Sequence, residues 1–424
     1  MLPPYSLEQT IARIVREEWG RILSCIVKNV GDFQLAEDVL QDAVEAALKT
    51  WPEKGVPKSP AAWLITTSHR KAIDRLRRLN NFKKKQADIA YLSQLPVYDI
   101  EEDNALTIPD ERLEMIFTCC HPALDEKTQI ALTLRTIGGL KTEEIARAFL
   151  DTSSAMAQRL VRAKKKIKLA AIPYKIPDQQ MMPSRLRGVL AVVYLIFNEG
   201  YSASSGENLT RVNLSNEAIR LARILVQLLP HEPEVLGLYA LLLLHDARRY
   251  ARLDKQGRMV ALEHQDRSLW DQQKAEEGNH TVKQALAKGA VGPYQLQACI
   301  SALHVGAADW ESTDWPQICG LYALLYQMQP TPIVRINQAI ALSYGSSLQA
   351  GIEVLHTLEN THDMTKNASF LLAKADVCER SGEVVPALRL LESALAFADN
   401  DIERAFVARK VESLRAAITS SSNK

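Results

Sequence analysis

The chain has 424 residues, 24% of them charged, and its acidic and basic side chains nearly cancel to a net charge of +1. The length predicts two or three domains, and the lack of any run of 18 apolar residues argues against a membrane-spanning helix and a membrane partner. The near-neutral total excludes no other partner, because strongly acidic and strongly basic segments can offset each other in the sum.

The first distinctive segment, Asp32 to Trp51, has the apolar spacing of a helix with one acidic face. The expected apolar side consists of Phe33, Ala36, Leu40, Val44 and Leu48. The opposite face consists of Glu37, Asp38, Gln41, Asp42 and Glu45. Like charges three and four residues apart on a helix repel each other unless a partner supplies cations. The face is therefore either solvated or docked on a basic protein surface.

A second helix is predicted to begin at Ser59, a good N-cap, with Pro60 in its first turn. Its expected apolar residues are Trp63, Ile65, Ala72, Ile73 and Leu76. Its other side carries six basic or potentially basic side chains within ten residues: His69, Arg70, Lys71, Arg75, Arg77 and Arg78. Such crowding, with a tryptophan shortly upstream, favours contact with a nucleic-acid strand over a purely solvated surface. Residues 80–109, which follow, are polar and poor in apolar periodicity, as in a linker.

Residues 139–168 have the pattern of two short helices separated by a polar turn. Thr142 is the predicted N-cap of the first helix, and the apolar stripe is expected at Ile145, Ala146 and Phe149. The second helix should bury Met156, Leu160, Ala163 and Ile167. It leaves Gln158, Arg159, Arg162, Lys164, Lys165 and Lys168 for solvent or phosphate. The pattern predicts a helix-turn-helix, with an ordinary charged helix pair as the alternative.

The order of these three motifs resembles that of bacterial extracytoplasmic-function sigma factors of the sigma-70 family. Residues 1–79 resemble sigma region 2, a helical bundle, and residues 110–172 resemble sigma region 4, a helix-turn-helix, with the linker 80–109 between them. Two positions depart from the usual pattern. His69-Arg70 stands where Arg-Asn is common, and Leu150 stands in the turn where Gly is frequent.

The resemblance implies core RNA polymerase and promoter DNA as partners and assigns three groups of residues to them. The polymerase-docking residues would be Asp32, Glu37, Asp38, Gln41 and Asp42. The residues reading the −10 element would be Trp63, His69, Arg70, Asp74, Arg75, Arg77 and Arg78. The residues reading the −35 element would be Thr152, Ser153, Ser154, Gln158, Arg159 and Arg162.

The remaining chain, residues 184–424, follows a proline-marked break at 172–177 and is predicted to be a succession of helices without alternating strand patterns. The whole chain is therefore expected to be all-α. Residues 336–355 and 370–395 have the pattern of two helical hairpins, in which Ala341 and Ala375 are separated by the period of a tetratricopeptide repeat. Several stretches, such as IFNEGYSASSG and HQDRSLWD, resemble the carboxy-terminal extension of one long sigma-factor subgroup.

The sequence offers no motif for catalysis, and we expect no enzyme, cofactor or metal site. There is no nucleophile motif, phosphate-binding glycine loop or metal-ligand spacing. Cys119-Cys120-His121 lacks the C-x-x-C arrangement of zinc sites, so buried packing is the preferred interpretation. The six cysteines are scattered, which does not suit a disulfide framework in a chain of this length. A polar cluster in the extension is the candidate site for a cytosolic ligand or protein: Asn198, Glu199, Tyr201, His245 and Asp246.

Three functions are consistent with these patterns. The preferred one is a cytoplasmic sigma factor, without a signal peptide, whose tetratricopeptide-like extension regulates it in cis. The second is a duplex-binding transcription regulator that acts without polymerase, and the third is a helical-repeat scaffold. The acidic face with Asp38 and Asp42 favours the first, since a stand-alone DNA-binding protein does not need it.

Overall fold

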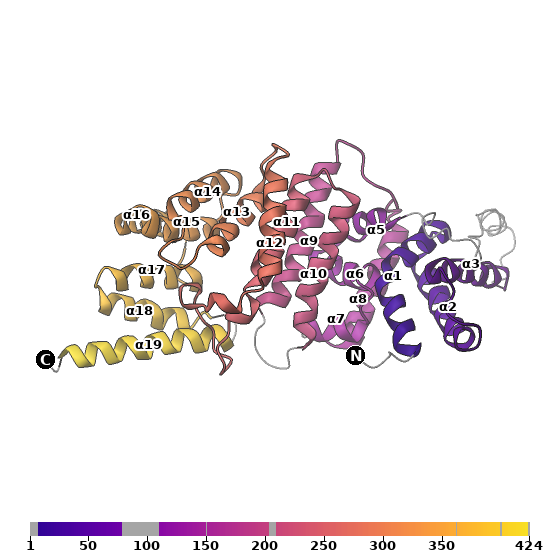
Figure 1. The fold of residues 1–424 in the computed structure, drawn as a ribbon, viewed down its shortest axis with the longest axis horizontal. Coiled ribbons are helices and arrows are strands. Elements are labelled where there is room, and N and C mark those ends of the chain that lie inside the picture. Colours follow the sequence, from indigo (N-terminus) through magenta and orange to yellow (C-terminus); the bar gives the residue numbers. More distant parts are fainter. Residues whose placement is uncertain are drawn as a thin grey trace. The chain divides into compact units, whose positions relative to one another are not determined.

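The computed structural model describes residues 7–78, 110–149, 151–202, 209–361, 363–398 and 401–422. Their contacts divide the chain into two units, residues 1–196 and 197–424. Apart from one isolated bridge between Leu253 and Met259, the regular structure of the described residues is helical, which confirms the all-α prediction (Figure 1). None of the described helices has the length and apolarity needed to cross a membrane.

Unit 1 begins with a three-helix bundle of α1, α2 and α3. Their bounds are Leu7–Val30, Phe33–Lys54 and Pro60–Arg78. The bundle core is formed by side chains that are at most 1% exposed, among them Ile22, Leu23, Leu40, Trp51 and Leu64. Asp32 caps α2 by accepting hydrogen bonds from the amides of Gln34 and Leu35, at 3.0 and 3.1 Å. Such a cap satisfies amides that the first helical turn leaves unpaired.

The buried stripe of α2 differs from the expected one at its carboxyl end. Leu48 is 44% exposed and Val44 only half-buried, so the predicted apolar positions there are wrong. Their place is taken by Val39, Ala43, Ala47 and Trp51. Because α2 packs against both α1 and α3, its buried surface is wider than a single stripe and is displaced toward these neighbours.

Among the described residues of unit 1, four shorter helices follow. They are α5 (Arg112–Cys119), α6 (Glu126–Thr136), α7 (Thr142–Ala148) and α8 (Ser153–Leu169). The helix α9 (Met182–Ser202) then crosses the boundary between the two units. Buried Cys119 places its Sγ 3.1 Å from Thr136 Oγ1, and burial raises the pKa of the Cys119 thiol and brings that of Cys120 to about 12. Both cysteines are therefore packed as small side chains of the core.

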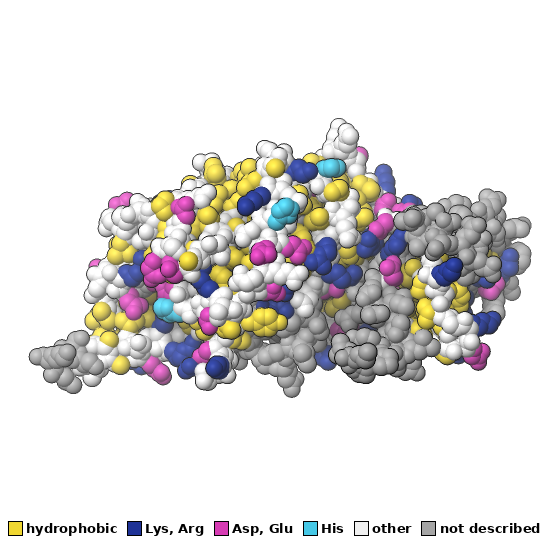
Figure 2. Space-filling model, in the orientation of Figure 1, with side chains coloured by type: hydrophobic (Ala, Val, Ile, Leu, Met, Phe, Trp, Pro, Cys, Tyr) yellow, Lys and Arg dark blue, Asp and Glu magenta, His cyan; other side chains and the backbone are white. Residues whose placement is uncertain are grey.

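Unit 2 contains ten further α-helices among its described residues. They are α10 (Leu209–Leu228), α11 (Pro233–Ala247), α12 (Gln272–Leu286), α13 (Pro293–Gly306), α14 (Trp315–Met328), α15 (Pro332–Gly345), α16 (Leu348–Thr361), α17 (Ala368–Arg380), α18 (Val384–Leu395) and α19 (Asp401–Ser422). The central helix α11 is buried all round because α10, α12 and α13 pack against it. Over these helices Figure 2 shows acidic and basic side chains interspersed with apolar ones on the face in view.

The two hairpins expected from the 34-residue spacing are present. They are formed by α15 with α16 and by α17 with α18, and Ala341 and Ala375 are both buried, 1% and 2% exposed. A Cβ atom at Gly351 would lie 2.7 Å from the carbonyl oxygen of Ala339, so the helices of the first hairpin approach closely. Two features were not predicted. The first is α19, and the second is the start of α12 at Gln272, since the sequence indicated a helix only from residue 281. Asp271 caps α12 by accepting a hydrogen bond from the amide of Lys274.

Candidate protein-docking and nucleic-acid interfaces

The acidic face of α2 meets the basic side of α3 within the bundle. The Arg75 guanidinium bridges two carboxylates of α2, at 3.0 Å to Asp38 Oδ2 and 2.9 Å to Asp42 Oδ2. All three side chains are about one-third exposed, and Gln41 beside them is exposed. The bridge relieves the repulsion between the two carboxylates, yet leaves them accessible to another cationic partner.

The basic side of α3 is narrower than its sequence suggests. His69 does not lie on the surface: it is 8% exposed and its Nε2 is 2.9 Å from Asn29 Nδ2. Burial lowers the pKa of His69 to about 4, so the ring is neutral near pH 7. Trp63 is half-buried against Trp51, with ring centroids 5.5 Å apart. The exposed members of the predicted set are Arg70, Asp74 and Arg77. The side chain of Arg78 lies outside the described residues.

The helix-turn-helix is formed by α7 and α8, and its first cap differs from the predicted one. Thr142 is the first helical residue and Lys141 is the N-cap, whose amide donates to Glu144 Oε2 at 2.7 Å. Phe149 is half-buried, and Ala148 is the more deeply buried member of this stripe. Leu150 lies outside the described residues. The buried stripe of α8 is as predicted: Met156, Leu160, Ala163 and Ile167.

The outward side of α8 holds the predicted −35 residues. Thr152 is the N-cap of α8, and its hydroxyl accepts from the amide of Ala155 at 3.1 Å. Arg159 is one-third exposed and pairs with Asp151 of the turn at 3.4 Å. The remaining predicted residues are exposed: Ser153, Ser154, Gln158 and Arg162. A positively charged, exposed helix face preceded by a polar turn is the arrangement with which helix-turn-helix proteins enter the major groove.

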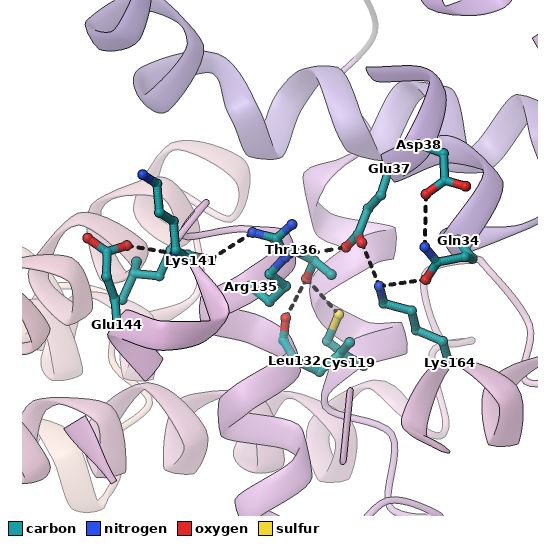
Figure 3. A network of polar contacts seen from close by, with 11 residues as sticks. Gln34, Glu37, Asp38, Cys119, Leu132, Arg135, Thr136, Lys141, Glu144 and Lys164 are labelled. Carbon is teal, nitrogen blue, oxygen red and sulfur yellow. Dashed lines mark hydrogen bonds and ion pairs between the residues drawn. The ribbon is translucent and has the colours of Figure 1, made fainter. Parts of the chain in front are cut away.

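A contact between the acidic and the basic helix was missed in the sequence. Glu37, predicted to lie on a face that is either solvated or docked on another protein, is 4% exposed and lies between two cations of residues 110–169 (Figure 3). Lys164 Nζ of α8 is 2.6 Å from Glu37 Oε2, and Arg135 Nε of α6 is 3.7 Å from Glu37 Oε1. Lys168 also pairs with Asp32 at 2.6 Å. Burial alone would raise the pKa of Asp32, but the bonds from Lys168 and the Leu35 amide outweigh it and lower this pKa.

The polar cluster proposed for the extension divides into inward and outward parts. His245 is half-buried, its Nε2 lies 3.0 Å from Ser301 Oγ, and desolvation of the ring together with Arg248 and Arg252 lowers its pKa to about 3. Asp246 is 0% exposed and pairs with Arg249 and, at 2.7 Å, with Lys274. Both groups therefore hold helices together, whereas Glu199 is exposed. No cluster of His, Cys, Asp and Glu suited to a metal ion occurs among the described residues.

Comparison with known families matches three parts of the chain. Residues 14–82 match sigma-70 region 2, residues 114–167 match sigma-70 region 4, and residues 185–286 match a family of unknown function, DUF6596. The first two are families of binding modules rather than enzymes.

The relatives extend these matches. An uncharacterized protein of Rhizobium meliloti is 37% identical over 397 residues, which cover 93% of both chains. The ECF RNA polymerase sigma factors SigK of Mycobacterium ulcerans and Mycobacterium tuberculosis are 23% and 25% identical, over 33% of this chain and 74% of theirs. No solved structure matches. With regions 2 and 4 in the expected order and an additional helical extension, the chain belongs to the extracytoplasmic-function sigma factors of the sigma-70 family.

Proposed function

We propose that the three groups of residues predicted above divide the work of this sigma factor. A sigma factor directs core RNA polymerase to promoters and initiates transcription there. In this proposal α2 docks on the polymerase, α3 reads the −10 element and α8 reads the −35 element, in the cytoplasm where polymerase is found. The observation that carries the proposal is the pair of accessible carboxylates, Asp38 and Asp42, beside an exposed basic helix-turn-helix in the same chain. A duplex-binding regulator without polymerase has no use for the acidic pair.

The −35 assignment is tested by replacing both Arg159 and Arg162 with Ala. Loss of a base contact is expected to cost about 1–3 kcal/mol and to relax specificity at one position of the element. Loss of a phosphate contact should instead weaken binding to all sequences and reduce its salt dependence. Run-off transcription and promoter binding at several salt concentrations, with reconstituted holoenzyme, measure both effects. Lys127→Ala, a charge removal on the exposed side of α6, is the control. Unchanged promoter selection and salt dependence in the double variant would place the reading surface elsewhere.

The extension, residues 184–424, is proposed to control the two sigma regions in cis in response to a cytosolic ligand or protein. Its size and its stacked hairpins support this role, because successive helical pairs present extended surfaces to partners. The inward contacts of His245 and Asp246 make them supports of such a site, and exposed Glu199 is the member of the proposed cluster that a partner can reach directly.

Ending the chain at about residue 180, before α9, is expected to change promoter-dependent transcription. Couplings between domains are typically about 1–3 kcal/mol, which corresponds to a change of roughly 5–150-fold. Run-off transcription with equal amounts of the full and shortened chains measures it, with circular dichroism to verify that the shortened chain is helical. If both chains transcribe equally under every condition tried, the extension does not control the sigma regions and the proposal is wrong.

A further inference from the structure

We propose that residues 110–169, the region 4 module, are an internal ligand of the polymerase-docking face of α2, so that the free chain is closed and competes with core polymerase for this face. The proposal rests on the docking role given to α2 above. Three observations within unit 1 support it: a buried ion-pair cluster, a backbone contact that requires glycine, and a geometry that prevents both promoter elements from being read together.

The ion-pair cluster is centred on Glu37. Its side chain is 6% exposed, while Lys164 is 10% exposed and Arg135 14% exposed. Taking a carboxylate out of water is costly unless cations and hydrogen bonds compensate it. Lys164 also donates to Gln34 Oε1 at 3.3 Å, and Arg135 is held in place by donating to the carbonyl of Leu140 at 3.0 Å (Figure 3). A member of the predicted docking face is thus buried by cations of the module that reads DNA.

The backbone contact lies at Gly20, in the interior of α1. A glycine inside a helix costs roughly 0.5–1 kcal/mol relative to alanine, so its presence calls for a reason. A Cβ atom at Gly20 would lie 2.7 Å from the carbonyl oxygen of Ile137 and 3.1 Å from its Cα atom. Across the same contact Gly139, at φ +69°, packs against Trp19, to which a Cβ atom would come within 3.1 Å. The close approach of the region 4 module to α1 therefore accounts for Gly20.

Further contacts join the region 2 bundle to the region 4 module. Lys28 of α1 pairs with Glu111 at 2.6 Å. Tyr174, which follows α8, donates its hydroxyl to the carbonyl oxygens of Ser24 and Glu111, at 3.0 and 3.2 Å. Burial raises the pKa of Tyr174, so its hydroxyl keeps the proton that it donates. The closed arrangement is consequently held by several contacts, and the loss of a buried one raises the fraction of chains that are open.

The closed arrangement is incompatible with reading a promoter. Elements centred near −10 and −35 are separated by about 25 base pairs, which is roughly 85 Å of duplex. In the closed chain α2, which belongs to the same bundle as the −10-reading helix α3, is joined to the −35-reading helix α8 through Glu37 and Lys164 at 2.6 Å. The modules must therefore separate. A chain as long as the predicted linker, residues 80–109, reaches on the order of 100 Å when fully extended, which permits this separation.

Two substitutions open the interface without touching a predicted docking carboxylate. Lys164→Gln removes the closest cation from Glu37. Gly20→Ala forces the backbone of Ile137 away, while it favours the α1 helix itself. Lys165→Gln is the matched control, because Lys165 follows Lys164 on α8, is exposed, and makes no ion pair with a described residue. Both lysine variants remove one charge from the same DNA-reading helix.

The experiment uses the full chain with two fluorophores, attached at exposed Glu53 in α2 and Glu143 in α7. Energy transfer should be high in the unaltered chain and in Lys165→Gln, and should fall in Lys164→Gln and Gly20→Ala. Core polymerase without DNA should bind the two opened variants at least tenfold more tightly, because the apparent Kd equals the intrinsic value divided by the open fraction.

The outcomes separate this proposal from the one on which it rests. If energy transfer stays high in both variants, closure through these contacts is refuted whatever polymerase does. If energy transfer falls but the affinity for polymerase does not change, competition for the α2 face is refuted. If the unaltered and the opened chains all fail to bind polymerase, the docking role of α2 is refuted instead. Energy transfer alone then tests whether the free chain is closed through these contacts.

Discussion

Reversing Asp38 and Asp42 to lysine together is expected to weaken binding to core polymerase by roughly 10–100-fold, as loss of complementary interfacial charges commonly does. The free energy of unfolding should fall by less than about 1 kcal/mol, because both carboxylates pair with the partly exposed Arg75 and Asp38 accepts one further hydrogen bond, from exposed Gln34 at 2.9 Å. The two effects are measured by pull-down of core polymerase and by urea denaturation of the same preparation.

Two variants control this experiment. Glu53→Lys reverses an exposed charge near the end of the same helix and should leave polymerase binding unchanged. Arg75→Gln frees both carboxylates without reversing them, so it should preserve binding or strengthen it. A folded double-lysine chain that captures polymerase as well as the original chain does would exclude Asp38 and Asp42 from the docking surface.

Replacing Asp246 with Ala is expected to lower the free energy of unfolding by about 3–5 kcal/mol, the usual cost of leaving buried cations without their counter-ion. Asp246 is 0% exposed and pairs with both Arg249 and Lys274, which joins the end of α11 to the start of α12. Urea denaturation followed by circular dichroism measures the loss, in the transition assigned to unit 2.

Glu392→Ala is the matched comparison for Asp246. Glu392 also accepts from an arginine, Arg415, at 2.6 Å, but both side chains are largely exposed. Exposed pairs contribute at most about 1 kcal/mol. Equal losses in the two variants would show that burial does not decide the strength of these ion pairs.

Features that repeat along one helix were predictable from the sequence. The buried stripe of α8 and the two hairpins at Ala341 and Ala375 follow from spacing, because helical periodicity determines which residues share a face. The partial exposure of Asp38 and Asp42 followed from the same reasoning, as did the exposure of Arg162.

Features that depend on a distant segment were not predictable in this way. The neighbours of Glu37 in the sequence are acidic, whereas the cations that pair with it come from α6 and α8, roughly a hundred residues away along the chain. His69 is likewise set among basic neighbours in sequence but is paired with Asn29 of another helix. One available signal was overlooked: an interior helical glycine, Gly20, indicates that another backbone approaches there.

The position of the closed interface within unit 1 also has a consequence for the order of events during synthesis. Every residue of the Glu37 cluster, and Gly20 with its neighbour Ile137, precedes residue 197. At about 5–20 residues per second, residues 197–424 need roughly 10–45 s to follow them out of the ribosome. Helices pack far faster than that. If the closure proposed above forms, the nascent chain closes its two sigma modules before the extension is complete, and the control proposed for the extension then acts on modules that are already joined.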